Sequence, residues 1–189
     1  MYQTDVSLVP TMILMREATY SDIPVIAQVH VDTWRSTYSG IVPDEVLTNL
    51  SYEKRETAWQ KVFDQAPNSN GFTYISEEET GQVIGFVDGG RERTGNQVYR
   101  GEINALYILS NYQNKGIGRN LVRLAVERLR QMDIHSMLVW VLENNPACKF
   151  YEALGGQRIQ SKDIEMRDNT LVELAYGWTD TSPLLKPLG

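Results

Sequence analysis

The stretch that most constrains the fold runs from Glu102 to Arg130. Its first part, Glu102–Leu109, is rich in β-formers and apolar side chains, as in a strand that is buried on both faces. A polar loop containing two glycines follows. After the loop, apolar residues at positions 117, 121, 124, 125 and 129 recur at helical spacing between arginines. The sequence therefore predicts a strand, a loop and a helix in direct succession.

The loop Gln113–Gly118, with the sequence QNKGIG, lies where the predicted helix begins. The first backbone N–H groups of a helix lack intrahelical partners, and the helix dipole is positive at that end. Glycines allow an anion to approach those groups closely. The loop is neither a Walker A motif nor a G-x-G-x-x-G dinucleotide motif, because the residues that those patterns require are missing. Two interpretations remain: a phosphate or pyrophosphate cradle, or an ordinary turn in which glycine permits close packing.

Composition limits the class of protein. A chain of 189 residues with 42% apolar and 22% charged residues suits one domain with a sizeable core. A single cysteine, Cys148, cannot form an internal disulfide, and with only two histidines we expect no metal site. No apolar run approaches the length of a membrane span, and no leader is recognisable, so we predict a cytoplasmic protein without membrane contact. The net charge of −6 disfavours nucleic-acid binding and is compatible with a cationic substrate.

Periodicity and turn signals outline the rest of the chain. We expect an N-terminal extension (1–11), one domain (12–180) and a C-terminal tail (181–189). Expected strands are 12–16, 72–76, 83–89, 102–109, 136–142, 158–166 and 171–178. Expected helices are 23–33, 44–49, 52–63, 117–130 and one that begins at Asn145-Pro146. This order predicts a mixed α/β layer rather than two domains.

Two blocks of the sequence resemble the GNAT acetyltransferase superfamily. Gln113, Gly116 and Gly118 match the superfamily's loop pattern Q/R-x-x-G-x-G/A. The segment Trp140–Gly156 resembles its next conserved block, a strand that ends in Asn and a helix that ends in F-Y-x-x-L-G. In this chain the matching residues are Asn144, Phe150, Tyr151, Leu154 and Gly155. Gly156 departs from the pattern, because an aromatic residue usually follows the first glycine.

The resemblance covers nearly the whole chain and implies a fold. That fold is α/β, with a mixed, mostly antiparallel central sheet that is flanked by helices and splayed between its two central strands. The resemblance also implies an acetyl-CoA-dependent N-acetyltransferase that acts on a primary amine of a small molecule or peptide, without an acyl-enzyme, and a homodimer. The alternatives are a CoA-binding regulatory domain without catalysis, and an enzyme with another acyl donor or a hydroxyl acceptor.

The resemblance further assigns residues to the cofactor. The pyrophosphate would be held by the loop amides of Gln113, Asn114, Lys115, Gly116, Ile117, Gly118 and Arg119. The backbone of Leu106, Tyr107 and Ile108 would pair with the pantetheine arm like an added strand. Asn144 would donate a hydrogen bond to CoA. The competing interpretations are solvated charges for Lys115 and Arg119, core packing for Leu106 and Ile108, and a turn residue for Asn144.

Four side chains are candidates for the chemistry. Tyr151 would act as general acid toward the CoA thiolate, and Glu102 as the base that takes the amine proton directly or through water. Trp34 and Tyr38, near a predicted break between helices, would form the wall that receives the acceptor. The alternatives are a half-buried tyrosine, a surface glutamate and ordinary aromatic packing. Cys148 is expected to be a packed helix residue rather than a nucleophile.

Overall fold

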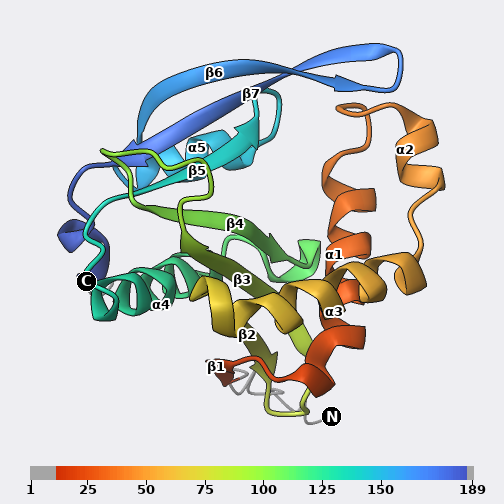
Figure 1. The fold of residues 1–189 in the computed structure, drawn as a ribbon. Coiled ribbons are helices and arrows are strands. Elements are labelled where there is room, and N and C mark those ends of the chain that lie inside the picture. The colour runs from red at the N-terminus through yellow and green to blue at the C-terminus, as the bar shows by residue number, and fades with distance from the viewer. Residues whose placement is uncertain (1–11, 187–189) are drawn as a thin grey trace, which may run out of the picture.

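The computed structural model describes residues 12–186, so the predicted extension 1–11 lies outside the described residues. These residues form one seven-stranded sheet with helices on both faces, in the strand order β1-β2-β3-β4-β5-β7-β6 (Figure 1). All neighbouring strands are antiparallel except β4 and β5, which are parallel. The predicted α/β fold, with a mixed and mostly antiparallel sheet, is confirmed.

The strands are β1 (Ile13–Glu17), β2 (Phe72–Glu78), β3 (Val83–Arg91), β4 (Gly101–Ile108), β5 (Met137–Leu142), β6 (Gln157–Met166) and β7 (Asn169–Trp178). The α-helices are α1 (Ile23–Thr37), α2 (Asp44–Thr48), α3 (Tyr52–Ser69), α4 (Ile117–Gln131) and α5 (Ala147–Ala153). Three short 3-10 turns are Tyr20–Asp22, Ser110–Tyr112 and Ser182–Leu185. None of the described helices is long and apolar enough to cross a membrane.

The helices cover the sheet unequally. The apolar stripe of α4 packs with alternate residues of β3, β4 and β5 into the larger core cluster, which includes Leu121, Ile84 and Ile103. On the opposite face, α1 and α3 pack on the other residues of β2 and β3, among them Ile75 and Phe86. The alternation of β-strand side chains between two faces therefore places α4 on one side and α1 with α3 on the other (Figure 1).

Helix α1 is longer than the sequence predicted. It continues to Thr37, and the N–H of Tyr38 still donates to the carbonyl of Trp34. The predicted helix end at Thr33 was therefore too early, although the predicted break before α2 is present: Trp34 lies inside the helix and Tyr38 follows its last residue. The helical hydrogen bonds continue because buried residues such as Val31 and Thr33 pack along the inner face up to that point. Both aromatic side chains consequently leave from one rigid helix.

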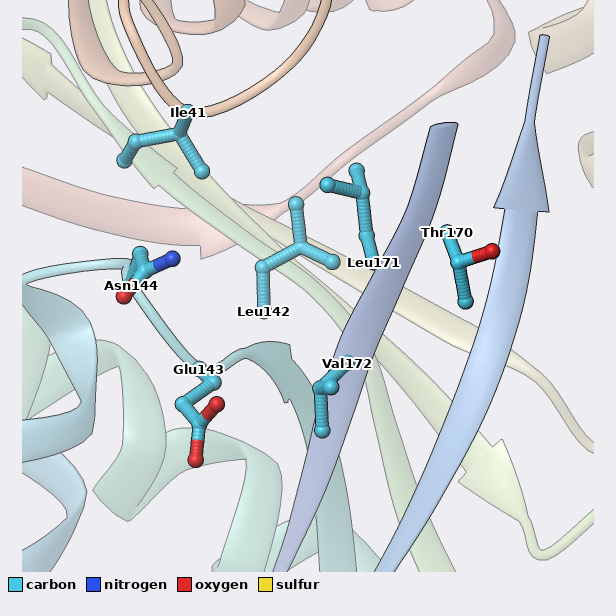
Figure 2. A pocket seen from close by; sticks show the side chains of 7 residues that line it. All are labelled: Ile41, Leu142, Glu143, Asn144, Thr170, Leu171 and Val172. Atoms are coloured by element: carbon cyan, nitrogen blue, oxygen red, sulfur yellow. The ribbon is translucent and has the colours of Figure 1, made fainter. Parts of the chain in front are cut away.

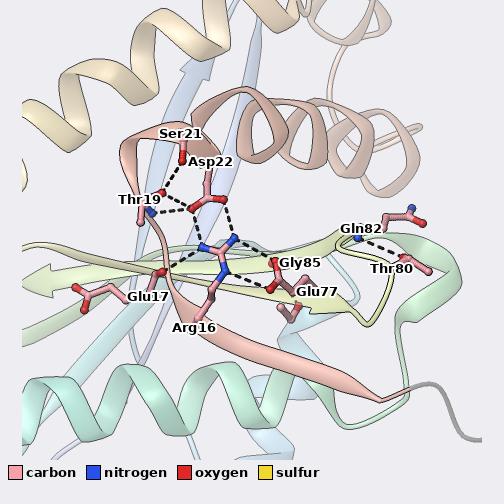
Figure 3. A network of polar contacts seen from close by, with 10 residues as sticks. Arg16, Glu17, Thr19, Ser21, Asp22, Glu77, Thr80, Gln82 and Gly85 are labelled. Carbon is pink, nitrogen blue, oxygen red and sulfur yellow. Dashed lines mark hydrogen bonds and ion pairs between the residues drawn. The ribbon is translucent and has the colours of Figure 1, made fainter.

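A polar network fixes the start of α1 to the sheet edge. The Arg16 guanidinium on β1 donates to Asp22, 2.8 Å, and to Glu77 on β2, 3.1 Å (Figure 3). The same contact with Arg16 holds the pKa of the Asp22 carboxyl well below its usual range. Asp22 also accepts hydrogen bonds from the backbone N–H and the hydroxyl of Thr19. The network therefore sets where α1 crosses the sheet.

The structure explains the unusual glycine at position 156. A Cβ built on Gly156 would lie 2.6 Å from the ring of Trp178. Trp178 comes from β7, and its indole N–H donates to the carbonyl of Leu154 at 3.0 Å. Here an aromatic ring from a distant strand occupies the space beside residue 156. The chain therefore fills this part of the core without an aromatic residue after Gly155.

The predicted tail 181–189 begins inside the fold. Thr181 is fully buried, and its N–H and hydroxyl both donate to the carbonyl of His135. Leu184 packs in the larger core cluster. The described start of this tail is therefore a short turn with one apolar anchor in the core.

The two central strands separate soon after they meet. β4 and β5 pair only at Gly101↔Met137, Glu102↔Leu138 and Ile103↔Val139. A register shift between Asp88 and Gly89 of β3 leaves Asn104 as an extra residue in the facing strand β4. Beyond this point β4 and β5 continue without pairing to each other. The sheet is splayed between its central strands, as predicted.

Candidate functional site

A cavity of about 660 Å³ occupies the region where β4 and β5 diverge. This volume is typical of sites that hold a small molecule or a cofactor arm. Five elements surround it: the second half of β4, the loop before α4, the middle of β5, the start of α5 and the end of α1. These elements come from both faces of the sheet.

The glycine loop forms one end of the cavity. Gly116 is the N-cap of α4 and has φ +80°, a left-handed conformation that favours glycine. The Gln113 side chain donates to the carbonyl of Ile108 at 2.9 Å, which ties the loop to the end of β4. The free N–H groups at the start of α4 therefore lie beside the cavity, as an anion site requires.

The loop residues divide into two groups. Gln113, Asn114, Gly116, Gly118 and Arg119 line the cavity, as the predicted pyrophosphate site requires.

Two predicted members do not line it. The Lys115 ammonium lies 5.1 Å from the ring centroid of Tyr112, and Ile117 is buried in the core. Helical periodicity explains Ile117, because it is the first apolar residue of the inner face of α4. The prediction for Lys115 and Ile117 concerned their backbone amides, so these side-chain positions leave it a prediction.

The other glycine of the motif allows close packing. A Cβ on Gly118 would lie 3.2 Å from the ring of Phe150 and 3.3 Å from the side chain of Ile108. The packing interpretation of the loop is therefore correct for Gly118, whereas Gly116 meets a backbone requirement. The two glycines differ in their physical reason, although they belong to one motif.

The far half of β4 forms the floor. Leu106, Tyr107 and Ile108 all line the cavity, and they lie beyond the last pair between β4 and β5. The backbone polar groups on this side of β4 have no neighbouring strand in β5, so an extended ligand could pair with them. Leu106 and Ile108 also pack on the larger core cluster, so their side chains serve the core as well.

Tyr151 lines the cavity from α5 and is 5% exposed. Burial, together with the nearby Tyr107 and Cys148, raises the pKa of its hydroxyl well above the ordinary value. The hydroxyl is therefore protonated at neutral pH and can donate a hydrogen bond. Its ring is held against those of Phe150, at 5.3 Å, and Tyr176, at 6.1 Å.

Two asparagines, Asn144 and Asn145, follow β5, and they line different cavities. Asn145, not Asn144, lines the main cavity; it is buried, and its side-chain oxygen accepts from the N–H of Ala147 at 2.9 Å. Asn144 is exposed and lines a separate cavity of about 120 Å³ with Ile41 and Thr170 (Figure 2). The structure therefore brings Asn145 to the wall of the main cavity and leaves Asn144 outside it.

Glu102 does not lie on the cavity wall. It is buried at the closed end of the splay, where β4 still pairs with β5, and its carboxylate binds the Arg93 guanidinium at 2.6 Å. Period-two alternation would put Glu102, Asn104, Leu106 and Ile108 on one face unless a bulge intervenes. The bulge at Asn104 breaks that alternation, so the structure does not bring Glu102 together with them.

Of the two predicted aromatic residues, Trp34 and Tyr38, only Tyr38 lines the cavity. Tyr38 lines it, and its hydroxyl faces Asn145 and Tyr107, while burial raises its pKa. Trp34 does not line the cavity; its ring packs on Tyr38 at 4.6 Å and its indole N–H donates to the Tyr107 hydroxyl at 2.9 Å. Trp34 therefore supports the wall from behind instead of forming it.

Several cavity residues escaped the sequence analysis. Thr33 on α1 is buried, lines the cavity and has a hydroxyl without a hydrogen-bond partner among the described residues. Asn104 and Trp140 line the cavity as well. Asp88, which binds Asn104, is buried within β3. Only Asp88 left a usable signal, a charged residue inside the apolar run VIGFVDGG.

Cys148 packs as expected. Its thiol donates weakly to the carbonyls of Leu142 and Glu143, both at 3.5 Å, and burial raises its pKa. A thiol with a raised pKa is a poor nucleophile. Between residues 12 and 186, no group of three or more His, Cys, Asp and Glu side chains is placed to hold a metal ion.

Comparison with known proteins identifies relatives along most of the chain. Residues 31–156 match the model of the acetyltransferase (GNAT) family. An uncharacterised N-acetyltransferase of Bacillus subtilis, YuaI, is 38% identical over 173 residues, which cover 92% of this chain and 96% of that protein. An L-methionine sulfoximine/L-methionine sulfone acetyltransferase of Pseudomonas aeruginosa is 24% identical over 134 residues, covering 70% of this chain and 73% of that protein.

Solved structures share the fold at low sequence identity. YncA of Salmonella typhimurium, determined with its cofactor acetyl-CoA, has a TM-score of 0.66 and 19% identity. The match covers 88% of this chain and 92% of that one.

Proposed function

This chain belongs to the acetyltransferase (GNAT) family and is an acetyltransferase, and we propose that it transfers the acetyl group of acetyl-CoA directly to a primary amine of a small molecule or peptide. One observation carries the proposal. The cavity at the diverging strands places the N-terminus of α4, the unpaired half of β4 and the Tyr151 hydroxyl around one continuous space.

The residues present fit acetyl-CoA. The N–H groups at the start of α4 suit its pyrophosphate, and Arg119 adds a cation at the same end of the cavity. The unpaired edge of β4 suits the amide-bearing pantetheine arm. Acetyl-CoA supplies an activated acetyl group as a thioester. A backbone N–H of Leu106, Tyr107 or Ile108 would hydrogen-bond the thioester carbonyl as negative charge develops there.

The proton movements are assigned to two residues. Tyr151 would donate a hydrogen bond to the leaving thiolate, for which a protonated hydroxyl is needed. Glu102 would receive the amine proton only through water, because its carboxylate is paired with Arg93 and lies outside the cavity wall. An ordered water molecule between the amine and the Glu102 carboxylate would carry the proton from one to the other.

The test of the activity uses an amine panel with acetyl-CoA. The panel contains L-methionine sulfoximine, L-methionine sulfone, a peptide with an N-terminal alanine and butylamine, with butanol as hydroxyl control. We expect the mass of one amine to rise by one acetyl group, with release of an equal amount of free thiol. Acetylation of the alcohol in preference to every amine would overturn the amine assignment.

A second measurement tests the donor. Acetyl-CoA and CoA should each raise the melting temperature in a concentration-dependent way, since a ligand of the folded state stabilises it. Absence of the shift at millimolar CoA would contradict the central proposal. A shift without transfer to any amine would favour the regulatory CoA-binding domain, and a faster reaction with a longer acyl-CoA would favour another donor.

A further inference from the structure

A buried carboxylate inside β3 connects three strands. Asp88 is 6% exposed and interrupts an apolar stretch of β3. It accepts one hydrogen bond from the Thr73 hydroxyl on β2 and one from the side-chain amide of Asn104 on β4, both 2.9 Å long. A buried carboxylate is costly unless its oxygens are hydrogen-bonded. These two hydrogen bonds satisfy the Asp88 carboxylate, and one of the two donors, Asn104, lines the cavity.

Asn104 occupies a special place in the sheet. It is the extra residue of the bulge, and it follows Ile103, the last residue of β4 that pairs with β5. Asn104 is exposed and lines the cavity. It therefore lies at the apex of the splay, where the floor of the cavity begins. Bulges commonly redirect a side chain next to a functional site.

The contact with Asp88 decides which atom Asn104 presents. An ionised carboxylate can only accept hydrogen bonds, so the NH₂ group of Asn104 must face it. The amide oxygen then faces the cavity, and no hydrogen bond of the structure within residues 12–186 engages it. The amide oxygen of Asn104 is thus available to accept a hydrogen bond from a ligand in the cavity.

A second polar group also indicates that the cavity binds a polar ligand. Thr33 on α1 lines the same cavity, and its hydroxyl is buried and lacks a partner among the described residues. A buried hydroxyl without a partner is unfavourable, so a polar ligand that bonds to it would stabilise the site. Both atoms lie on the side of the sheet that α1 covers, opposite α4 and its glycine loop.

We propose that the Asn104 amide oxygen binds the nitrogen of the acceptor, with Asp88 as the positioning residue that fixes the amide orientation. This inference rests on the proposed acetyl transfer and specifies how the acceptor is recognised. The acceptor must present N–H donors to a neutral oxygen, and an ammonium does this most strongly because the hydrogen bond is charge-assisted. Asp88 itself never touches the acceptor.

A pH dependence follows from this arrangement. Burial raises the pKa of Asp88 to about 6, against the hydrogen bonds from Asn104 and Thr73 and the nearby Arg93, which lower it. When Asp88 takes up a proton from solvent, its carboxyl becomes a donor, and the Asn104 amide can turn over to accept from it. The NH₂ group then faces the cavity, where it repels an ammonium. Acceptor binding should therefore weaken as the pH falls through about 6.

The neighbouring titratable groups do not reproduce this behaviour. Arg93, which lies beyond the end of β3 and whose charge acts on Asp88, stays cationic and is paired with Glu102. On the helices that cover this face, His30 on α1 has a pKa lowered to about 3 by burial and by Arg55, so it remains neutral between pH 5 and 8. Arg55 on α3, which contributes to the lowered pKa of His30, is a guanidinium throughout this range, and so is Arg119 at the α4 end of the cavity.

The first arm of the test measures acceptor kinetics at saturating acetyl-CoA, with the best amine of the panel. Asn104→Ala should raise the KM for the amine about tenfold or more at pH 7.5, since it removes a charge-assisted hydrogen bond. The KM for acetyl-CoA and the CoA-induced rise in melting temperature should stay as in wild type. An unchanged KM for the amine would overturn the proposal.

The second arm compares pH profiles between pH 5.0 and 8.0. In wild type the KM for the amine should rise several-fold below pH 6, and Asp88→Asn should abolish that rise because residue 88 no longer titrates. Protonation of the amine itself affects both proteins equally, so their ratio isolates the side chain. Thr73→Val removes a hydrogen bond that lowers the Asp88 pKa, and should move the acidic limb to higher pH. If the KM for the amine rises at the same acidic pH in wild type, Asp88→Asn and Thr73→Val, the role of Asp88 is overturned.

A third arm needs no substitution and no acceptor. The side-chain NH₂ resonances of Asn104 in ¹⁵N-labelled wild-type protein should titrate with a midpoint near pH 6, as the amide changes partner. Resonances that stay constant from pH 5.0 to 8.0 would overturn the switch. Failure of the proposed activity is distinguishable, because it appears as no acetylation by wild type and no stabilisation by CoA.

Discussion

The two sides of the cavity are built in different ways. The side next to α4 comes mainly from one continuous stretch, the end of β4, the loop Gln113–Gly118 and the first turn of α4. The side next to α1 is assembled from α1, β5 and the bulge of β4, with support from β2 and β3. The first side depends on local backbone geometry and the second on long-range contacts. We therefore expect the donor site to tolerate changes in the sheet core and the acceptor site to respond to them.

The largest expected effect comes from Gly116→Val. A β-branched residue is strained at φ +80°, and the α4 N-terminus would shift away from the pyrophosphate position. We expect loss of the CoA-induced rise in melting temperature and a drop of at least about 100-fold in kcat/KM for acetyl-CoA, as for removal of a major anion contact.

Gly95→Val is the matched control, because Gly95 also has φ +80° but lies outside the cavity. Both variants should lose about 1–2 kcal/mol of stability from backbone strain. If the Gly95 variant loses CoA binding equally, the effect is global and the local account of the donor side fails.

Tyr151→Phe should be the next largest. We expect kcat to fall about 100-fold with little change in the KM for acetyl-CoA, because the hydroxyl acts as the thiolate forms. The control is Tyr176→Phe, whose ring lies 6.1 Å from that of Tyr151 and whose hydroxyl donates to Glu152. That variant should lose about 1 kcal/mol of stability while kcat is unchanged. Steady-state kinetics and thermal denaturation distinguish the two; equal turnover of wild type and Tyr151→Phe would remove Tyr151 from the chemistry.

Glu102→Gln tests whether the acceptor side contains a base. The substitution keeps the shape and removes the basicity. We expect kcat/KM for the amine to fall about 10-fold to 100-fold near pH 7, with partial recovery at alkaline pH where more of the amine is unprotonated. A pH–rate profile of both proteins measures this.

The alternative role for Glu102 predicts a different profile. If Glu102 only anchors Arg93, the fall in kcat/KM of Glu102→Gln would be equal at every pH. Arg93→Ala would then reproduce that fall. That outcome would leave proton removal to water and confine the role of Glu102 to the sheet.

The smallest expected effect is that of Trp34→Phe. It removes the hydrogen bond to Tyr107 and keeps most of the packing on Tyr38. A net hydrogen bond contributes about 1 kcal/mol, so the KM for the amine should rise about 5-fold while the CoA-induced stabilisation is kept. Isothermal titration with CoA and amine kinetics would measure both; weakened CoA binding would show that the two sides of the cavity are coupled.

Local sequence determined the donor side almost completely. The change from strand to helical periodicity located β4, the loop and α4 to within one or two residues, because backbone preferences and side-chain spacing act over a few residues. Gly116 could be recognised for the same reason, because a left-handed N-cap is a local requirement, whereas the close contact of Gly118 with Phe150 joins two different helices. The α/β class likewise followed from the order of elements, and the mixed, mostly antiparallel sheet from the resemblance to the GNAT superfamily.

Tertiary structure alone decided the acceptor side. The burial of Glu102 against Arg93 depends on where β4 and β5 stop pairing. The contact of Asp88 with Asn104 depends on a bulge that joins residues 16 positions apart. A one-residue change of register reverses the face of every following side chain, and no local pattern encodes such a change. The sequence therefore determined which elements form, and the pairing of distant strands determined which side chains they turn toward the acceptor.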